Sequence, residues 1–583
     1  MITKKFVLLD IDYVTRNRKP VIRLFGKILG DEYESIIALD KSFRPYFYVV
    51  PHDMGDCIDE LNTLNLLKME KVLRNDGGTS IGVLKVTLEN PPDIPKYREK
   101  IKDFPSVKEI REHDIPFYRR YLIDKGISPM NMVEVQGKVL SAKSGTCKLE
   151  MEGSPKVFES DVPELKFLSF NIEVYNPQGM PQADRDPIVI ISFSTNQGFR
   201  KVISTKNCLL SFVDTVPDEK SLMEKFVEIV QNENPDIILG YNSDAFDFPY
   251  LQERARQLGV TLNLGVDGSK LKFTRVGMGN AAMIRGRVHI DLYSNLRRYL
   301  QLDSYTLENV YKEFFREEKL DIPGDEIYRY WDAGGERLKN LLYYSLDDAV
   351  AVTEIGEKIL PLNMELTRIV GQPLFEVARM ASGRYVEWYL IKKSYEYGNL
   401  VPNKASPSEL SRREDIHVEG SYVKEPIQGL HENIVYFDFR SLYPTVIIAK
   451  NISPDSLASD DGEEYYVAPE YGHRFRKTPQ GFIPSAIEKI LEDRIRIKSL
   501  MKESDDISQI QVLDVQQQAL KRMANTIYGL YNHSTFRWYS LECSEAITSW
   551  GRDFLKKSME DAEKHGFKPL YADTDGFFVT YKD

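Results

Sequence analysis

Three acidic residues have the type and spacing that metal-dependent chemistry needs. Asp438 interrupts the apolar run ENIVYFDFR, and Asp573 and Asp575 lie two residues apart in YADTDG. A carboxylate in an apolar run is costly unless a cation meets it, and two carboxylates in one extended segment point to the same face. Three carboxylates from two strands would supply the oxygen ligands that Mg²⁺ uses in phosphoryl transfer. The alternatives are a core aspartate held by backbone amides and an exposed Asp-Gly hairpin.

A candidate phosphate-binding surface lies between these acidic segments. Residues 485–531 predict two helices joined by the polar turn KESDDIS, and an S-x-x-E capping box of Ser485 and Glu488 predicts where the first helix begins. Polar residues three or four apart share one face of each helix: Arg494 and Lys498 on the first, and Gln517, Lys521, Asn525 and Tyr528 on the second. A triphosphate could lie between these faces, and the alternative is a pair of solvated helix surfaces.

Composition limits the class of protein. The length of 583 residues predicts about four domains. The four cysteines include no C-x-x-C pair, which excludes a disulfide framework and a cysteine zinc site. No secretory leader and no apolar run of about 18 residues is present, so a cytoplasmic protein without a membrane partner is expected. The net charge of −11 by itself argues mildly against a polyanionic partner.

The pattern of predicted elements changes along the chain. Residues 1–153 are rich in alternating and β-branched runs, which favours a β-rich α+β domain. From Lys166 strands alternate with helices, an α/β pattern, and a long helical region begins near Leu362. The predicted fold class is therefore multidomain, with α/β and α+β parts.

Three segments, in this order, resemble motifs A, B and C of family B DNA polymerases, most closely the archaeal replicative members. They are DFRSLYPT (438–445), QALKRMANTIYG (518–529) and YADTDG (571–576), and GQPL (371–374) and RRYLIDKG (119–126) extend the resemblance over nearly the whole chain. The resemblance implies a series of domains: an N-terminal domain (1–153), a ribonuclease H-like 3′–5′ exonuclease domain (154–360), a palm of antiparallel sheet plus helices (361–484 and 534–583) and two-helix fingers (485–533).

The resemblance also implies a polymerase site. Asp438 and Asp575, with the Phe439 carbonyl, would bind two Mg²⁺ ions, and Asp573 would lie close by. The residues implied to bind the incoming dNTP are Leu442, Tyr443, Arg494, Lys498, Lys521, Asn525 and Tyr528. Among these, the Tyr443 ring would leave no room for a ribose 2′-hydroxyl.

The exonuclease motifs match the family with one departure. Asn171 and Glu173 point the same way from LSFNIEV, Asp247 lies in YNSDAFDFPY, and Tyr344 and Asp348 lie four apart on a helix in YSLDDA. The family has Asp where this chain has Asn171, and two Mg²⁺ ions are expected only at an intact site. Because an amide offers one neutral oxygen in place of a carboxylate, we expect severely weakened exonuclease activity and intact polymerisation.

Two further features follow from the resemblance. Residues implied to capture template uracil are Tyr13, Pro45, Ile94, Pro116, Phe117 and Arg120, with Ile94 in place of the usual Val and with core packing as the alternative. Between exonuclease and palm, Val418, Glu419, Gly420 and Ser421 replace the usual Tyr-x-Gly-Gly/Ala element, so coordination between the two sites is expected to differ.

The resemblance implies primer–template DNA and dNTPs as partners, and a sliding clamp is compatible with it. The thumb that follows motif C in the family is absent from the sequence. Either the chain is cut short or a second polypeptide carries the thumb, and a naturally split enzyme is the favoured alternative. A nucleoid-associated location is expected. Two rival functions stay open: a DNA-binding subunit with an inactive polymerase site, and a nuclease with a vestigial polymerase domain.

Overall fold

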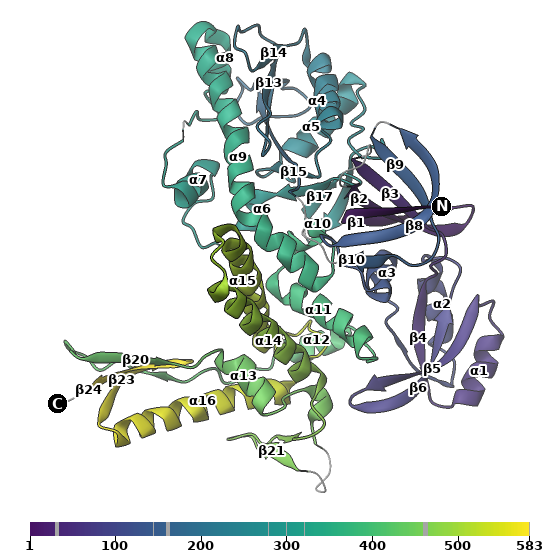
Figure 1. Ribbon diagram of the computed structural model, residues 1–583, viewed down its shortest axis with the longest axis vertical. Coiled ribbons are helices and arrows are strands. Elements are labelled where there is room, and N and C mark those ends of the chain that lie inside the picture. Colours follow the sequence, from purple (N-terminus) through teal and green to yellow (C-terminus); the bar gives the residue numbers. More distant parts are fainter. Residues whose placement is uncertain are drawn as a thin grey trace. The chain divides into compact units, whose positions relative to one another are not determined.

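Two sheets and a long helix form most of the first compact unit, Met1–Phe43 with Tyr121–Ala381. The second unit is Arg44–Arg120 with Ser382–Asp583. The computed structural model (Figure 1) describes residues 1–28, 34–143, 145–158, 164–277, 279–298, 300–319, 321–458 and 464–581.

The N-terminal sheet of the first unit closes on itself. Its order is β1-β2-β3-β9-β8-β10, and β1 also pairs with β8, so five of its strands form a ring. Its strands are β1 (Ile2–Arg16), β2 (Lys19–Ile28), β3 (Ser35–Asp40), β8 (Met132–Lys143), β9 (Thr146–Met151) and β10 (Lys156–Phe158). Val21, Phe25, Ile37 and Leu39 pack together as buried core within this sheet.

The second sheet of this unit has helices on both faces. Its order is β14-β13-β12-β11-β15-β18, with β11, β15 and β18 parallel. Its strands are β11 (Phe167–Val174), β12 (Ile188–Thr195), β13 (Arg200–Ser204), β14 (Val213–Thr215), β15 (Ile237–Gly240) and β18 (Val288–Asp291). Such two-sided burial explains why β12 reads as IVIISFST and is buried along its whole length.

Side-chain alternation along β11 assigns its two faces. Phe170 and Ile172 pack in a core with α4 (Glu219–Glu233) and α5 (Asp247–Leu258). Ser169 faces the other way and donates from Oγ to the Ala349 carbonyl of α9 (Gly335–Val370). Asn171 and Glu173 follow Ser169 at intervals of two residues, so β11 turns both toward α9. Figure 1 shows α9 running along this sheet.

Short elements complete the first unit. They are the hairpin β16 (Lys272–Val276) and β17 (Gly279–Met283), and the helices α6 (Leu292–Leu296), α7 (Leu307–Phe315), α8 (Ile327–Ala333) and α10 (Leu374–Val377). The helix α3 (Phe117–Lys125) crosses the boundary between the two units.

The second unit begins with a small sheet of order β5-β6-β4-β7. Its elements are β4 (Tyr46–Pro51), α1 (Met54–Asn62), β5 (Lys68–Asp76), β6 (Thr79–Thr87), α2 (Asp93–Ile101) and β7 (Val107–Arg111). One core of buried side chains from β4, β6, α1 and α2, including Phe47, Leu61, Val86 and Ile101, holds them together.

A four-stranded sheet of order β19-β23-β24-β20, here called the C-terminal sheet, carries the acidic motifs. Its strands are β19 (Val423–Lys424), β20 (Ile434–Asp438), β23 (Phe567–Asp573) and β24 (Gly576–Tyr581). The helix α16 (Leu541–Lys564) packs Leu555 and Met559 against it. Other elements of the second unit are α11 (Ser382–Glu396), α12 (Pro407–Glu414), α13 (Leu442–Ala449), the 3-10 turn η1 (Pro454–Ser456), β21 (Tyr465–Val467) and β22 (Arg474–Arg476).

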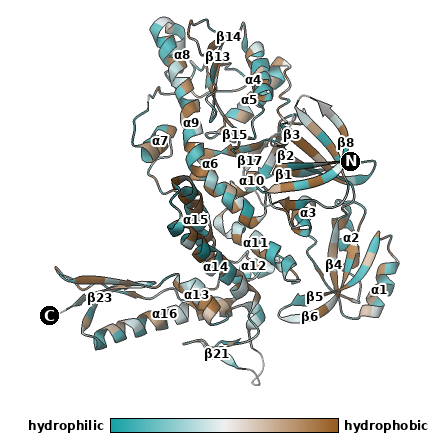
Figure 2. Cartoon of the chain, viewed as in Figure 1, coloured by the Kyte–Doolittle hydropathy of each residue, from teal (hydrophilic) through white to brown (hydrophobic). Residues whose placement is uncertain are grey.

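Two long helices, α14 (Phe482–Glu503) and α15 (Ile507–Leu530), confirm the predicted helical pair. Both are striped with hydrophilic and hydrophobic residues in Figure 2, as amphipathic helices are. The predicted capping box is wrong, because α14 begins at Phe482 with Gly481 as its N-cap. The Ser485 hydroxyl instead donates to the Gly481 carbonyl at 2.9 Å, within the first turn. Among the described residues, no helix is both long enough and apolar enough to cross a membrane.

Candidate functional site

The three acidic residues of the motifs meet at one end of the C-terminal sheet. Asp438 of β20 and Asp573 of β23 both pair with Gly576, the first residue of β24, from opposite sides. The Phe439 amide donates to the Asp575 carbonyl at 2.7 Å, which ties the turn to the end of β20. Asp573 and Asp575 do not share an extended segment as predicted, because Thr574 between them has a φ of 58°.

The acidic cluster is more exposed than the sequence predicts. Every residue of β20 is exposed, including Asp438, so the expectation of a carboxylate in an apolar interior is wrong. Partial burial raises the pKa of Asp575, and the nearby charges of Asp438 and Asp573 raise it further. In the part of the chain that the structure describes, none of the three forms an ion pair with a basic side chain. The cluster therefore carries negative charge that no basic side chain among the described residues pairs with.

This charge suits a bound cation, although the protein supplies few ligands. No group of three or more His, Cys, Asp or Glu side chains in the described residues is close enough to hold a metal ion. Mg²⁺ commonly binds through one or two carboxylates and takes its other ligands from substrate phosphates and water. Asp438 and Asp575 fit that mode of binding, with the nucleotide as the source of the missing ligands.

Two tyrosines lie beside the cluster. The Tyr443 ring of α13 stacks on the Tyr528 ring of α15, with centroids 4.0 Å apart and planes 19° apart. Gly551 of α16 makes room for this pair, because a Cβ there would lie 2.9 Å from Tyr443 Cε1. Leu442, which precedes Tyr443, is buried and anchors the start of α13.

The predicted basic faces of the helical pair do meet. Arg494 Nε of α14 donates to Gln517 Oε1 of α15 at 3.4 Å. Burial lowers the pKa of Arg494, and the Arg440 cation lowers it further, so two guanidinium groups lie close together there. Within the described residues, the side chains of Lys498, Lys521 and Asn525 form no hydrogen bond or ion pair, so they are available to an anion.

The exonuclease-motif residues also come together, in the first unit. Asn171 Nδ2 donates to Glu173 Oε1 at 2.8 Å and lies 3.3 Å from Asp348 Oδ2 of α9. Burial raises the pKa of Glu173 well above its usual range, and the charges of Asp348 and Asp247 add to this. Burial likewise raises the pKa of Asp247, the first residue of α5, to about 7. The structure therefore brings these motif residues together.

Lys319 is a member of this cluster that sequence reasoning missed. Its ammonium forms an ion pair with Asp348 Oδ1, and both side chains are almost fully buried, at 3% and 8% exposure. The ammonium also lies 4.8 Å from the centre of the Tyr344 ring. Lys319 sits in the irregular segment between α7 and α8, where no periodicity signals a buried cation.

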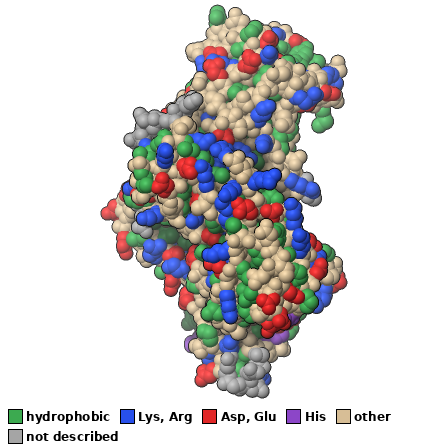
Figure 3. Space-filling view, turned by 90° about the vertical axis from the view of Figure 1, so that its right-hand side faces the viewer, with side chains coloured by type: hydrophobic (Ala, Val, Ile, Leu, Met, Phe, Trp, Pro, Cys, Tyr) green, Lys and Arg blue, Asp and Glu red, His purple; other side chains and the backbone are tan. Residues whose placement is uncertain are grey.

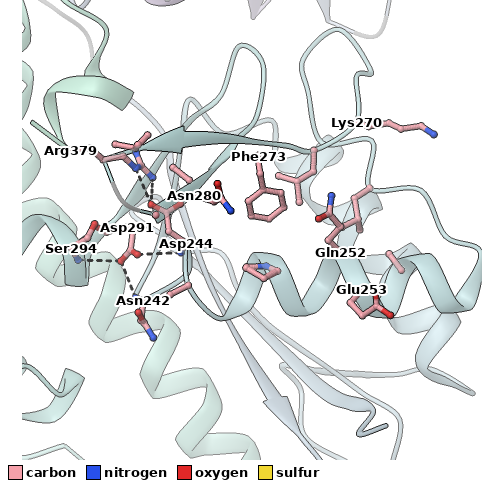
Figure 4. A pocket seen from close by; sticks show the side chains of 18 of the residues that line it. Asn242, Asp244, Gln252, Glu253, Lys270, Phe273, Asn280, Asp291, Ser294 and Arg379 are labelled. Atoms are coloured by element: carbon pink, nitrogen blue, oxygen red, sulfur yellow. Dashed lines mark hydrogen bonds and ion pairs between the residues drawn. The ribbon is translucent and has the colours of Figure 1, made fainter. Parts of the chain in front are cut away.

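A cavity of about 1040 Å³ in the first unit lies beside α5 and the β16–β17 hairpin (Figure 4). The ion pair of Arg379 and Asp244, 2.8 Å long, lines one end of it. Asp291 accepts backbone hydrogen bonds from Asn242 and Asp244 at the same end. None of the five predicted exonuclease residues lines this cavity.

The residues predicted to capture uracil divide between the two units. Tyr13 belongs to the first unit and the other five to the second. Ile94 packs against the core of the small sheet, as the core-packing alternative expects. Arg120 pairs with Glu112 at 2.6 Å and lies 4.8 Å from the centre of the Tyr46 ring. Pro45 and Phe117 are buried and Pro116 is exposed.

The fold and these two clusters define a class, a nucleic acid polymerase that also carries an exonuclease domain. Residues 108–310 match the family model described as "DNA polymerase family B, exonuclease domain", and residues 375–582 match "DNA polymerase family B". The chain is 42% identical to a DNA polymerase of Thermococcus gorgonarius over 98% of its own length and 71% of the relative. It is 41% identical to DNA polymerase 1 of Pyrococcus abyssi over the same shares.

A solved structure agrees with these sequence matches. The family B DNA polymerase from the hyperthermophilic archaeon Pyrobaculum calidifontis superposes with a TM-score of 0.86 at 33% identity. That match covers 99% of this chain and 75% of the other. The chain belongs to the archaeal family B DNA polymerases and is an enzyme, as the resemblance of its motifs predicted.

Proposed function

We propose that this chain adds deoxynucleotides to a primer 3′-hydroxyl on a DNA template, at the acidic end of the C-terminal sheet. The observation that carries the proposal is the convergence of Asp438, Asp573 and Asp575 at one end of the sheet, with no ion-pair partner among the described residues. Partial burial raises the pKa of Asp575, and the charges of Asp438 and Asp573 raise it further. Two Mg²⁺ ions bound there would activate the 3′-hydroxyl and neutralise the leaving pyrophosphate.

The protein's own contribution is to bind and orient the nucleotide. Arg494 and Lys498 of α14, with Lys521 and Asn525 of α15, form a donor-rich surface for the triphosphate. Tyr443 lies under the sugar, where its ring excludes a 2′-hydroxyl, and Tyr528 supports the nascent base pair. The stacking of these two rings fixes both at one place. An inactive polymerase subunit is disfavoured because the acidic residues are all present and converge.

We further propose that the exonuclease domain is impaired. The Asn171 amide donates to Glu173 and Asp348, so it presents hydrogen atoms where an acidic side chain would present oxygen ligands. This also disfavours a nuclease with a vestigial polymerase domain.

The other proposals concern partners. The family relationship supports primer–template DNA and dNTPs as ligands, and a template-uracil pocket at Tyr13, Pro45, Ile94, Pro116, Phe117 and Arg120 remains a proposal. A further polypeptide strand is proposed to dock on β20, the exposed edge strand of the C-terminal sheet. A sliding clamp is the remaining proposed partner.

A primer-extension gel with and without dNTPs tests the proposed activities. With Mg²⁺ and dNTPs, we expect the chain, supplied with a thumb segment if it needs one, to extend a labelled primer. Asp575→Asn should lower the rate by about 100-fold or more, because it removes negative charge on which metal binding depends. Without dNTPs, the chain should leave the primer intact and Asn171→Asp should gain degradation. Degradation without extension by the unmodified chain would overturn both assignments.

A further inference from the structure

The exonuclease-motif cluster contains its own cation. Glu173, Asp247 and Asp348 bring three carboxylates into a buried space, which is expensive unless positive charge meets them. Lys319 supplies that charge, since its ammonium pairs with Asp348 and is only 3% exposed. The ring of Tyr344 faces the same ammonium at 4.8 Å and stabilises it by a cation–π contact.

Asn171 completes the arrangement. One Asp348 oxygen, Oδ1, binds the Lys319 ammonium, and the other, Oδ2, faces the Asn171 amide at 3.3 Å. Glu173 Oε1 accepts from the same amide at 2.8 Å. Both oxygens of Asp348 and one of Glu173 are therefore committed to protein donors. A divalent ion would have to displace an ammonium and an amide to reach them.

The residues present do not fit the metals that the family's exonuclease domain uses. Asn171 offers one neutral oxygen, and its amide nitrogen donates to Glu173 and Asp348, the two side chains that would otherwise serve as ligands. An aspartate at position 171 would add a fourth acidic group, and in its ionised form it could not donate to its neighbours, so it would favour a divalent cation. With asparagine there, one ammonium and one amide satisfy the cluster.

We infer that Lys319 is the resident cation of this cluster, and that Asn171 and Lys319 together close the site to divalent metals. The cluster then acts as a buried ion-pair network between β11, α5 and α9, and the exonuclease domain keeps its fold without metal. This inference rests on the proposed loss of exonuclease activity and supplies a physical cause for it.

A manganese titration tests the inference directly. The full chain carries Asp438→Ala and Asp575→Ala, so that the polymerase site does not bind the ion, and free Mn²⁺ is followed by electron paramagnetic resonance. This background should bind no Mn²⁺ at the exonuclease cluster. Adding Asn171→Asp, or separately Lys319→Met, should create a site that binds Mn²⁺ at least about tenfold more tightly than the background chain does. Glu173→Gln should abolish the binding that either change creates.

Two controls keep the test decisive. Lys312→Met removes a lysine that is exposed and paired with Glu318, and it should leave Mn²⁺ binding as in the background. Lys319→Arg preserves the charge and should also match the background. If Lys319→Met does not fold, the background chain and its Asn171→Asp variant still decide the question.

The outcomes separate this inference from the proposed function. The inference would be overturned if the background chain bound Mn²⁺ tightly and Glu173→Gln abolished that binding. If that same chain degraded no primer, the proposed loss of exonuclease activity would stand on another cause. If it did degrade primer, both would fail.

Discussion

At the scale of single residues, position 171 decides what its cluster can bind. The Asn171 amide both donates hydrogen bonds and lacks a charge, so it changes the ligand set and the charge balance together. Such a change is readable from the sequence because it falls inside a motif. Lys319 is not readable in this way, because it lies 29 residues from its partner Asp348, in a segment without periodicity.

Tyr443 is predicted to set sugar selectivity. Its ring is held by stacking on Tyr528, so replacing it with a smaller side chain opens space beside the sugar. We expect Tyr443→Val to raise ribonucleotide incorporation relative to deoxynucleotide by about 100-fold. Single-nucleotide extension with dCTP and CTP measures the ratio. The control Tyr466→Val changes an aromatic residue of β21 and should leave the ratio unchanged.

His289 is predicted to make the chain less stable in mild acid. Burial lowers its pKa to about 4, and the Arg379 cation lowers it while Asp244 opposes the shift. The unfolded chain therefore takes up a proton near pH 6.5 that the folded chain refuses until about pH 4. The neutral imidazole's contribution to the free energy of unfolding is complete above about pH 6.5 and decreases as the pH falls toward 4. At pH 5 about 2 kcal/mol of it is lost.

Urea unfolding at pH 7 and pH 5 checks this prediction. His289→Gln retains groups that can bond to Ser243 and Ala282, which now contact the imidazole at 2.9 and 3.0 Å. Between pH 7 and pH 5, the free energy of unfolding should fall by about 2 kcal/mol less in this variant than in the unmodified chain. An equal loss in both proteins would contradict the assignment. His565→Gln, at an exposed histidine, serves as the control.

At the scale of elements, the sequence predicted the helical pair and the hairpin of β23 and β24, because amphipathic periodicity and turn residues are local signals. The predicted Asp-Gly turn is one residue out of place, since Thr574 and Asp575 form the turn and Gly576 begins β24. It failed where a neighbour decides the outcome. The start of α14 moved to Phe482 because Gly481 is its N-cap and its carbonyl takes the Ser485 hydroxyl. The exposure of β20 depends on its place at the edge of the C-terminal sheet, which no local pattern encodes.

The close approach of α13 and α16 is predicted to depend on Gly551. A methyl group there would lie 2.9 Å from the Tyr443 ring, so the ring must move away from Tyr528. We expect Gly551→Ala to raise the KM for dNTPs about tenfold. The melting temperature should change little, because alanine favours the helix over glycine by about 1 kcal/mol and offsets the displacement.

A double variant isolates this contact. In the Tyr443→Val background, Gly551→Ala should have no further effect on KM, since the smaller side chain leaves room for the methyl group. A further rise in KM would show that the effect does not pass through Tyr443. Lys557→Ala, at an exposed position of α16, is the control for a change in the helix itself.

At the scale of the whole molecule, the net charge of −11 gives a misleading indication of the partner. Basic and acidic side chains are both spread over the face drawn in Figure 3, so the overall sum says little about any one surface. Anion binding depends on local groups, and Arg440 and Arg494 lie close enough for one to lower the pKa of the other. For this reason the motifs predicted the class of protein while the composition did not.

The C-terminal sheet is predicted to bind a further strand. β20 lies at its edge, and Ile434, Val435, Tyr436 and Phe437 are 40–52% exposed there. A cavity of about 390 Å³ lined by Phe437, Phe439, Phe567 and Phe577 opens beside it. Unpaired edges with exposed apolar side chains recruit strands from other segments. The curated relatives, of which the match covers 71%, contain sequence that could supply one.

The part of the Thermococcus gorgonarius relative that lies outside the match is a suitable probe of this surface. We expect it to bind the chain and to increase primer extension, because a strand paired with β20 would cover the apolar side chains. Val435→Lys should weaken the binding by about tenfold or more, since it places a charge in a desolvated contact. Val467→Lys changes a valine of β21 that is 51% exposed and should bind as the unmodified chain does. Isothermal titration calorimetry measures both affinities, and equal weakening by the two variants would rule out β20 as the docking strand.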